Sequence, residues 1–329
     1  MKRKFSFALF YQKFGVLVLF VILFAAAMII EPVFIKPANL INLLRQIVVI
    51  TLIACGGCFM LITAQINVAY DGLIPAIGCT ACLVMRATGN VFLAVGAGLL
   101  LGAAAGYLFG CAVTILKVPS FLAGLAVSSI AGGLIMVVTG GVIKMDLGAL
   151  SFIGKGTIGP IPFSVFIMIA VMLICHFILT KTTFGRKVFA VGGNRRAAVA
   201  TGIKADRVQR IVYVLDGLTC ATAAIIYMSR VGSCQPNSGK GYAFDAITGA
   251  VIGGCSIYGG KGNILGCLVG AAIVGVLDNL MGLMGVNSHW QTIASGLIIL
   301  LAVIIDMATK EAAARASKNL MNAKAEENA

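Results

Sequence analysis

Residues 162–180 read PFSVFIMIAVMLICHFILT, a stretch with no acidic residue, lysine or arginine. A helix of about 20 mostly apolar residues is long enough to cross the hydrocarbon core of a bilayer. Across the whole chain of 329 residues, 60% are hydrophobic and 11% are charged, whereas a soluble domain has about 25% charged residues. This composition excludes a water-soluble globule and predicts a polytopic membrane protein.

Comparable apolar stretches recur along the chain and together predict an all-α fold with about ten transmembrane helices. They lie at residues 14–35, 40–64, 71–87, 91–116, 119–139, 162–180, 208–229, 245–258, 263–285 and 289–307. The stretch at 245–258 is short and glycine-rich, so we leave open whether it spans or re-enters the membrane. Non-helical backbone at that depth is tolerated where protein covers it.

The net charge of +14 is compatible with a nucleic-acid-binding protein, but Lys and Arg also mark the cytoplasmic loops of membrane proteins. With the N-terminus inside, 18 of the 25 basic residues lie on the cytoplasmic side, and Arg45 lies within the second stretch. The six on the outer side are Lys36, Arg86, Lys144, Lys155, Arg230 and Lys240. We therefore predict two cytoplasmic termini, a transmembrane domain over 1–307 and a polar cytoplasmic tail over 308–329.

Glycines recur every four residues in the fourth stretch, at Gly98, Gly102, Gly106 and Gly110. Such spacing lets another helix approach closely. Part of this pattern returns 168 residues later, where Gly98, Gly102, Val118 and Ser120 are matched by Gly266, Gly270, Val286 and Ser288. We hypothesise from this match that the ten helices form an inverted repeat of two five-helix halves, an architecture that recurs among transporters.

Three other classes of site find little support. The pairs Cys55-Gly-Gly-Cys58 and Cys79-Thr-Ala-Cys82 have nearly the spacing of a zinc ribbon, but both lie in apolar stretches, so we interpret them as buried small side chains and predict no metal site. Gly259-Gly-Lys-Gly262 lacks the spacing and the hydroxyl of a phosphate-binding loop. No catalytic set is evident, so we expect neither a cofactor nor an enzyme.

The longest polar segment between the apolar stretches begins at Lys181 and contains eight basic residues up to Arg210. Asn194 is a good helix N-cap, and we expect Gly192 and Gly193 to form a turn before it. Arg195 to Thr201 then form a short alanine-rich helix that Gly202 can end. A short helix with small residues on one face suits docking into a groove of a partner; the alternative is a merely solvated basic loop.

The order of residues in this segment resembles the permease subunits of bacterial ABC importers of the ribose, xylose and arabinose type. The resemblance begins with GRKVFAVGGN (185–194), followed by Ala197-Ala198 and Gly202-Ile203. Further segments similar to that family are VPSF (118–121), TGG (139–141), SCQPNSGKGY (233–242), DAI (245–247) and VIGGCSIYGGKG (251–262). The resemblance covers about residues 40–307.

The resemblance implies a multi-pass permease of a bacterial plasma membrane that imports a monosaccharide or a similar small polyol. It implies three kinds of partner: a second permease chain, identical or different, a cytoplasmic ABC ATPase that binds ATP, and an extracytoplasmic substrate-binding protein. The translocation path would lie between the two permeases. The loop 181–207 would couple to the ATPase through Gly192, Gly193, Asn194, Arg195, Arg196, Ala197, Ala198 and Gly202.

The chain departs from the family pattern in three places. Where relatives have Gly-Ile-Asp-Leu-Ser-Val-Gly-Ser, residues 65–72 read QINVAYDG, so Asn67 replaces an acid. Arg195-Arg196 replace an acidic residue after the asparagine, which suggests a compensating acidic patch on the ATPase. Asp278-Asn279 replace a common Asn-Asn pair, and Asp216 adds an acid to the seventh apolar stretch.

Residues expected along the translocation path are Gln65, Asn67, Phe121, Asp278 and Asn279. An acid at membrane depth is costly unless it faces water or a partner. We hypothesise that Asp278 and Asn279 face the path, and we favour a structural hydrogen bond for Asp216. A heterodimer whose second permease keeps the usual motif is a further hypothesis.

Two alternative functions stay open. One is a permease of the same architecture that carries nucleosides, branched-chain amino acids or a signalling furanose. The other is a secondary transporter driven by an ion gradient.

Overall fold

The computed structural model describes residues 7–144, 147–236, 238–287, 289–301, 303–304 and 307. Its long helices are α1 (Phe7–Ile30), α2 (Pro37–Ile62), α3 (Tyr70–Thr88), α4 (Val91–Thr114), α5 (Ser120–Thr139), α7 (Phe163–Lys181), α10 (Ala205–Val231) and α12 (Ile264–Leu283). Its shorter helices are η1 (Pro32–Ile35), η2 (Gly148–Leu150), α6 (Ser151–Lys155), α8 (Thr183–Gly193), α9 (Arg195–Ala200) and α11 (Tyr242–Ile252). A last apolar helix covers His289–Leu301.

Sheet structure is confined to two short antiparallel pairs in the described residues. Strand β1 (Ile143–Lys144) pairs with β4 (Ser233–Cys234), and β2 (Thr157–Ile158) pairs with β3 (Ile161–Pro162). The prediction of a polytopic all-α membrane protein is therefore confirmed.

Each of the ten predicted apolar stretches overlaps a helix in the described residues. Among the described residues, six helices are long and apolar enough to cross a membrane: α2, α4, α5, α7, α10 and α12. Helix α11 has 11 residues and is about 16 Å long, roughly half the thickness of a bilayer core. It ends before Gly253 and Gly254, the second of which has a φ of +93°, so the stretch 245–258 does not cross as a helix.

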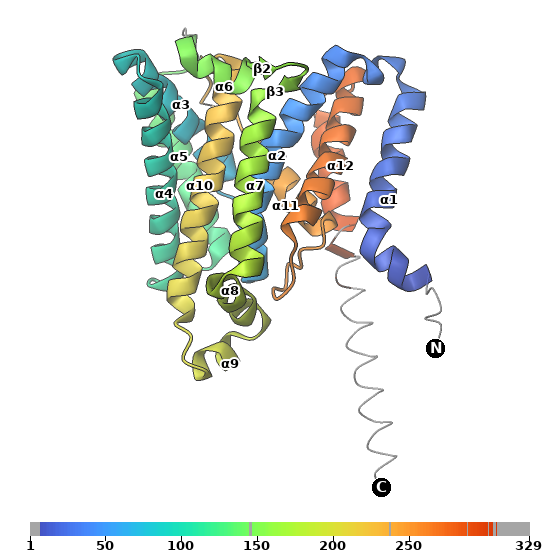
Figure 1. Cartoon of the computed structure of the whole chain (residues 1–329). Coiled ribbons are helices and arrows are strands. Elements are labelled where there is room, and N and C mark those ends of the chain that lie inside the picture. The colour runs from blue at the N-terminus through green and yellow to red at the C-terminus, as the bar shows by residue number, and fades with distance from the viewer. Residues whose placement is uncertain are drawn as a thin grey trace.

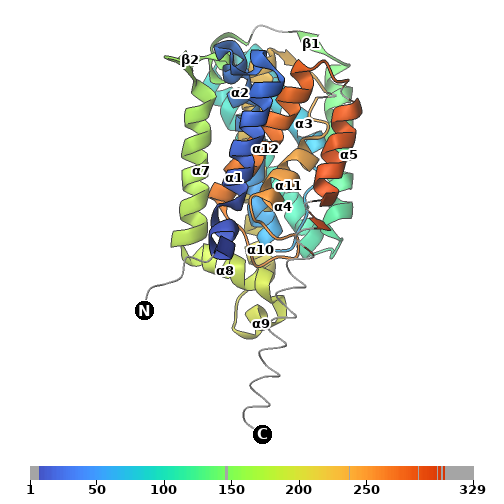
Figure 2. The same ribbon diagram turned by 90° about the vertical axis from the view of Figure 1, so that its right-hand side faces the viewer.

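The helices lie side by side in one bundle, with α8 and α9 at one end and α6 and the β2–β3 hairpin at the other (Figure 1). The first turns of α1 lie at the α8–α9 end (Figure 2). Helix α2 is the most enclosed of these helices: 83% of the residues in its most apolar 18-residue segment are buried, against 17% for α5 and 22% for α4. The bundle thus places α2 at its centre and leaves the apolar surfaces of α4 and α5 for lipid or a partner.

The glycine series of α4 lies against α10, as the spacing predicts. A side chain at Gly102 would overlap the carbonyl oxygen of Gly217, and one at Gly106 would overlap that of Tyr213. Gly266 and Gly270 of α12 pack in the same way against the backbone at Gly253 and Gly249. Close helix approach at both glycine series is confirmed. The inverted repeat stays a hypothesis, and Ser288 and the tail 308–329 lie outside the described residues.

Substitution in this contact should destabilise the bundle. Gly102→Leu forces α4 away from α10, and overpacking of this kind costs about 1–3 kcal/mol. Gly96→Leu is the matched control, because no atom lies within 4 Å of a Cβ at that position. We expect the first variant alone to lower the midpoint of thermal unfolding of the protein in detergent. Equal midpoints would show that the α4–α10 contact is not tight.

Candidate functional site

The segment predicted to dock on a partner consists of α8 and α9, which Asn194 separates. The Asn194 side chain accepts a hydrogen bond from the Ala197 amide at 3.0 Å, and Gly202, with a φ of +85°, follows the end of α9. The N-cap and the helix end are where the sequence predicts them. The expected turn at Gly192 and Gly193 is wrong: both close α8, because Thr182 caps a helix that continues without interruption to Gly193.

Helix α8 is fixed to the bundle through backbone contacts. A side chain at Gly192 would overlap the carbonyl oxygen of Ile62, the last residue of α2. That same oxygen accepts a hydrogen bond from the Gly260 amide at 2.9 Å. The end of α8, the end of α2 and the loop between α11 and α12 therefore meet at one point, where no flexible side chain separates the three backbones.

Helix α9 projects from the bundle (Figure 1). Arg196 and Ala197 are exposed on it, whereas Ala198 is buried. Arg195 forms an ion pair with Asp206, which also pairs with Lys117 at 3.4 Å. The charge of Arg195 is thus balanced within the chain. Arg196 forms no ion pair in the described part of the chain and presents its charge outward.

A buried polar cluster joins α3 and α10 beneath this end. Asp216 is 2% exposed. Its carboxylate accepts hydrogen bonds from the Tyr70 hydroxyl at 2.5 Å and from the Asn67 amide at 2.6 Å. The Asn67 oxygen in turn accepts a hydrogen bond from the Ala69 amide at 2.7 Å. The structural interpretation of Asp216 is confirmed, and Asn67 lies inside the protein in this conformation.

Two of the departures from the family pattern are therefore neighbours. Asn67 stands where the family has an acid, and Asp216 supplies an acid from α10 to the same contact. The acid and the amide of this pair both come from one chain. The motif around Asn67 consequently gives no reason of its own to expect a second kind of permease.

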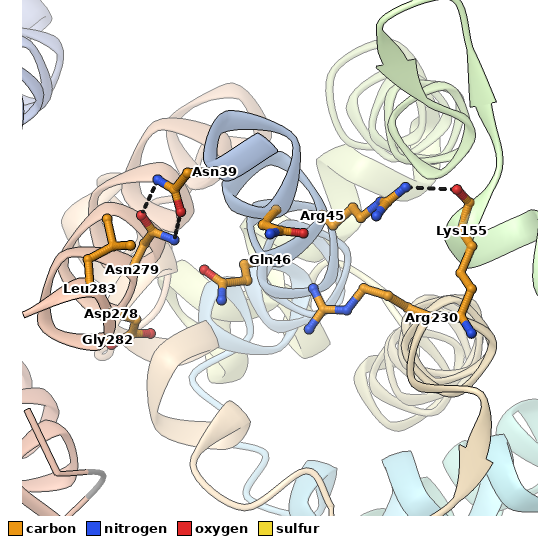
Figure 3. A pocket seen from close by; sticks show the side chains of 10 residues that line it. Asn39, Arg45, Gln46, Lys155, Arg230, Asp278, Asn279, Gly282 and Leu283 are labelled. Atoms are coloured by element: carbon orange, nitrogen blue, oxygen red, sulfur yellow. Dashed lines mark hydrogen bonds between the residues drawn. The ribbon is translucent and has the colours of Figure 1, made fainter. Parts of the chain in front are cut away.

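A polar cavity of about 600 Å³ lies between α2, α6, α10 and α12 (Figure 3). Helix α6 lies at the opposite end of the bundle from α9 (Figure 1). Asp278 and Asn279 both line it, as do residues that the sequence analysis did not single out. The lining residues are Asn39, Asn42, Arg45, Gln46, Lys155, Arg230, Asp278, Asn279, Gly282 and Leu283.

Asn279 is fixed by Asn39 in this cavity. Their amides exchange two hydrogen bonds, of 2.9 Å and 3.1 Å, and Asn39 also donates to the Phe34 carbonyl. Asp278 is half-buried beside this pair. The other residues predicted for the path lie elsewhere: Gln65 follows the far end of α2, and Phe121 is 48% exposed in the first turn of α5.

A pattern in the sequence could have indicated this cavity. Asn39, Asn42 and Arg45 recur every three residues at the start of a predicted span, and Gln46 lies four residues after Asn42. That spacing places them on one face of a helix, and polar residues inside a membrane are functional candidates. Lys155 and Arg230 carry no comparable signal, because only the fold brings them to α2.

The cysteines group differently from their sequence pairs. Cys79 is disulfide-bonded. Cys58 lies with Cys255 and Cys267, with sulfur atoms 3.2 Å and 3.5 Å from that of Cys255, and all three side chains are buried. Cys255 belongs to the loop that contacts Gly192, and Cys58 and Cys267 belong to α2 and α12. Three sulfur atoms this close suit a thiophilic metal ion, so the expected absence of a metal site stays a prediction.

A family model described as "Branched-chain amino acid transport system / permease component" matches residues 39–303. The chain belongs to this permease family. The match includes the cavity, the Asp216 cluster and the α8–α9 segment. The protein is therefore a component of a membrane transport system, with several apolar membrane-crossing helices.

Curated relatives of the permease extend over nearly its whole length. The ribose import permease protein RbsC of Bacillus subtilis (strain 168) is 37% identical over 299 residues, 90% of this chain and 92% of the relative. RbsC of Escherichia coli (strain K12) is 36% identical over 297 residues, 88% and 92% of the two chains. The L-arabinose transport system permease protein AraH of the same strain is 33% identical over 307 residues, 93% of each. No solved structure matches the permease at a significant level.

Loss of the Asp216 carboxylate should destabilise the permease. Asp216→Ala leaves the Tyr70 hydroxyl and the Asn67 amide unpaired, and each such buried group costs about 1–3 kcal/mol. Asp206→Ala is the control, because its carboxylate is 44% exposed and surface ion pairs contribute about 0–1 kcal/mol. Thermal unfolding of the purified permease compares the two. A similar loss in both variants would contradict a structural role for the cluster.

The exchange of acid and amide can be tested directly. Asn67→Asp alone brings two carboxylates together, whereas Asn67→Asp with Asp216→Asn restores one acid and one amide in reversed positions. We expect the double variant to be more stable than Asn67→Asp, measured as the coupling in a double-mutant cycle. Additive effects would show that the two side chains do not interact.

Proposed function

We propose that this permease is the membrane subunit of an ATP-driven importer of a monosaccharide or a similar small polyol, in a bacterial plasma membrane. The observation behind this proposal is the identity of 33–37% with ribose and arabinose permeases over about nine-tenths of both chains. In this assignment the chain itself performs no covalent chemistry. ATP is bound and hydrolysed by a separate ABC ATPase.

The distribution of charge supports an orientation with both termini in the cytoplasm. The segment that contains α8 and α9 holds eight basic residues between Lys181 and Arg210, and cytoplasmic loops are rich in Lys and Arg. The first turns of α1 lie at the same end. A substrate-binding protein would then approach the opposite end, where the polar cavity lies. A second permease chain, the same or different, completes the path.

Helix α2 offers a physical route from the ATPase to the cavity. Its last residue, Ile62, contacts Gly192 of α8, and its first turns carry Asn39, Arg45 and Gln46 to the cavity. When the ATPase closes against α8 and α9, the movement would pass directly to the backbone of α2, because no side chain lies between the two backbones at Gly192. The same displacement would reach α11 and α12 through Gly260, and it would convert the permease pair between outward-open and inward-open states.

Reconstitution tests the proposal against its alternatives. The permease is placed in liposomes with candidate ABC ATPases and substrate-binding proteins from the same cell, and uptake is measured with pentoses, hexoses, nucleosides and branched-chain amino acids. ATP-dependent uptake of a sugar supports the proposal, and uptake of another solute reassigns the cargo. Uptake without ATP or partner chains would instead indicate an ion-coupled transporter.

The contact at Gly192 should be necessary for coupling. A single methyl group in Gly192→Ala overlaps the Ile62 backbone, whereas Gly193→Ala adds the same group where no atom of the chain lies within 4 Å. We expect Gly192→Ala to reduce uptake at least about tenfold, equivalent to about 1.4 kcal/mol, while the ATPase remains bound and active. Gly193→Ala is the control for weaker binding of the ATPase, because it adds a methyl group to the same segment without touching the Ile62 backbone. Normal uptake by Gly192→Ala would exclude this route of coupling.

A further inference from the structure

The polar cavity contains an excess of positive charge. Arg45, Lys155 and Arg230 line it, and Asp278 is the one acid among its lining residues. The ion pairs found within the described residues both involve Asp206, at the other end of the bundle. None of the three cations of the cavity is therefore neutralised by a carboxylate in that part of the chain.

Arg45 and Arg230 both have N–H groups that donate no hydrogen bond within the described structure. An Nη atom of Arg45 donates to the Lys155 carbonyl at 2.7 Å, while its Nε is buried with no hydrogen-bond partner in the described structure. The guanidinium of Arg230 lies 5.9 Å from the centre of the Tyr227 ring and reaches toward Gln46 (Figure 3). The Gln46 carbonyl oxygen is also buried and unpartnered among these residues.

The location of these charges makes them unusual. Lys and Arg are depleted on the outer side of membrane proteins, and only seven of the 25 basic residues are assigned to the outer side or to the second span. Three of the seven line this one cavity. Arg45 and Arg230 are half-buried, whereas Lys155 is exposed. Half-buried cations in the bundle of a membrane protein mark a substrate or ion site.

We propose that the cavity binds an anionic, hydroxyl-bearing solute, namely a sugar acid whose carboxylate is recognised by Arg45 and Arg230. This proposal rests on the proposed function and narrows its substrate class. The planar guanidinium fork matches a carboxylate in two parallel hydrogen bonds. The amides of Asn42 and Gln46 offer donors and acceptors for hydroxyl groups.

Asp278 would orient the bound solute within the cavity. It lies on the far side of Gln46 from Arg230 (Figure 3). A carboxylate is repelled from that wall and attracted to the arginines, while a hydroxyl group can donate to Asp278. A solute with its acid at one end and hydroxyls at the other is therefore oriented, whereas a neutral sugar leaves the arginines unpaired.

Binding to the purified permease alone tests the inference independently of transport. The probes form matched sets: glucose, glucuronate and glucose 6-phosphate, and galactose, galacturonate and galactose 1-phosphate. A ligand that binds only the folded protein raises its unfolding midpoint. We expect a rise with at least one uronate and none with the neutral sugars. A rise with a sugar phosphate alone would overturn the assignment of the ligand to the sugar acids.

Charge variants identify the site. Arg45→Gln and Arg230→Gln should weaken uronate binding at least tenfold, and Asp278→Asn should strengthen it, which a merely structural role does not predict. Arg86→Gln removes an exposed cation in the last turn of α3 and should leave binding unchanged. Absence of binding by every anionic probe, or binding that is insensitive to both arginine variants, overturns the inference.

Failure of this inference and failure of the proposed function are distinguishable in the reconstituted importer. ATP-driven uptake of neutral sugars that Arg45→Gln and Arg230→Gln leave unchanged would remove the sugar-acid site and keep the importer. Arginine variants that lose only their affinity for the substrate-binding protein would make the cations a docking surface and also overturn the inference.

Discussion

A polar group inside a bilayer has no water to bond to, so it must find its partner within the protein. This constraint shapes every part of the permease. Helices pair their own backbone groups, and glycines such as Gly102 and Gly106 let α4 and α10 pack backbone to backbone. Side chains at membrane depth follow the same constraint, since Asn39 and Asn279 pair with each other across 240 residues of sequence.

The polar cavity is an exception to this rule, because some of its polar groups have no partner within the described part of the protein. Its walls hold charged groups that find no ionic partner in the described structure, which is costly in a site without function and expected in one that binds a polar solute. The Asp216 cluster shows the opposite arrangement, because each oxygen of its carboxylate accepts a hydrogen bond, one from Tyr70 and one from Asn67. Two acids that look equivalent in the sequence, Asp216 and Asp278, therefore have different environments.

Helix α2 connects these regions. One end contacts the backbone of α8, its middle passes Asp216 at Gly56, and its other end lines the cavity. A buried helix with close contacts at both ends moves as a rigid element more readily than it bends. The coupling proposed for this permease depends on that rigidity and on the absence of side chains at the Gly192 contact.

The sequence by itself determined the features that depend on local order: the apolar stretches, the glycine spacing, the N-cap at Asn194 and the end of α9 near Gly202. Each needs only residues within one or two helical turns. The tertiary structure alone decided that Asn67 meets Asp216, that Arg195 meets Asp206, and that Arg45, Lys155 and Arg230 share a cavity with Asp278. These partners are up to 233 positions apart, and an unpaired polar residue in an apolar stretch shows that a partner is needed without showing which helix supplies it.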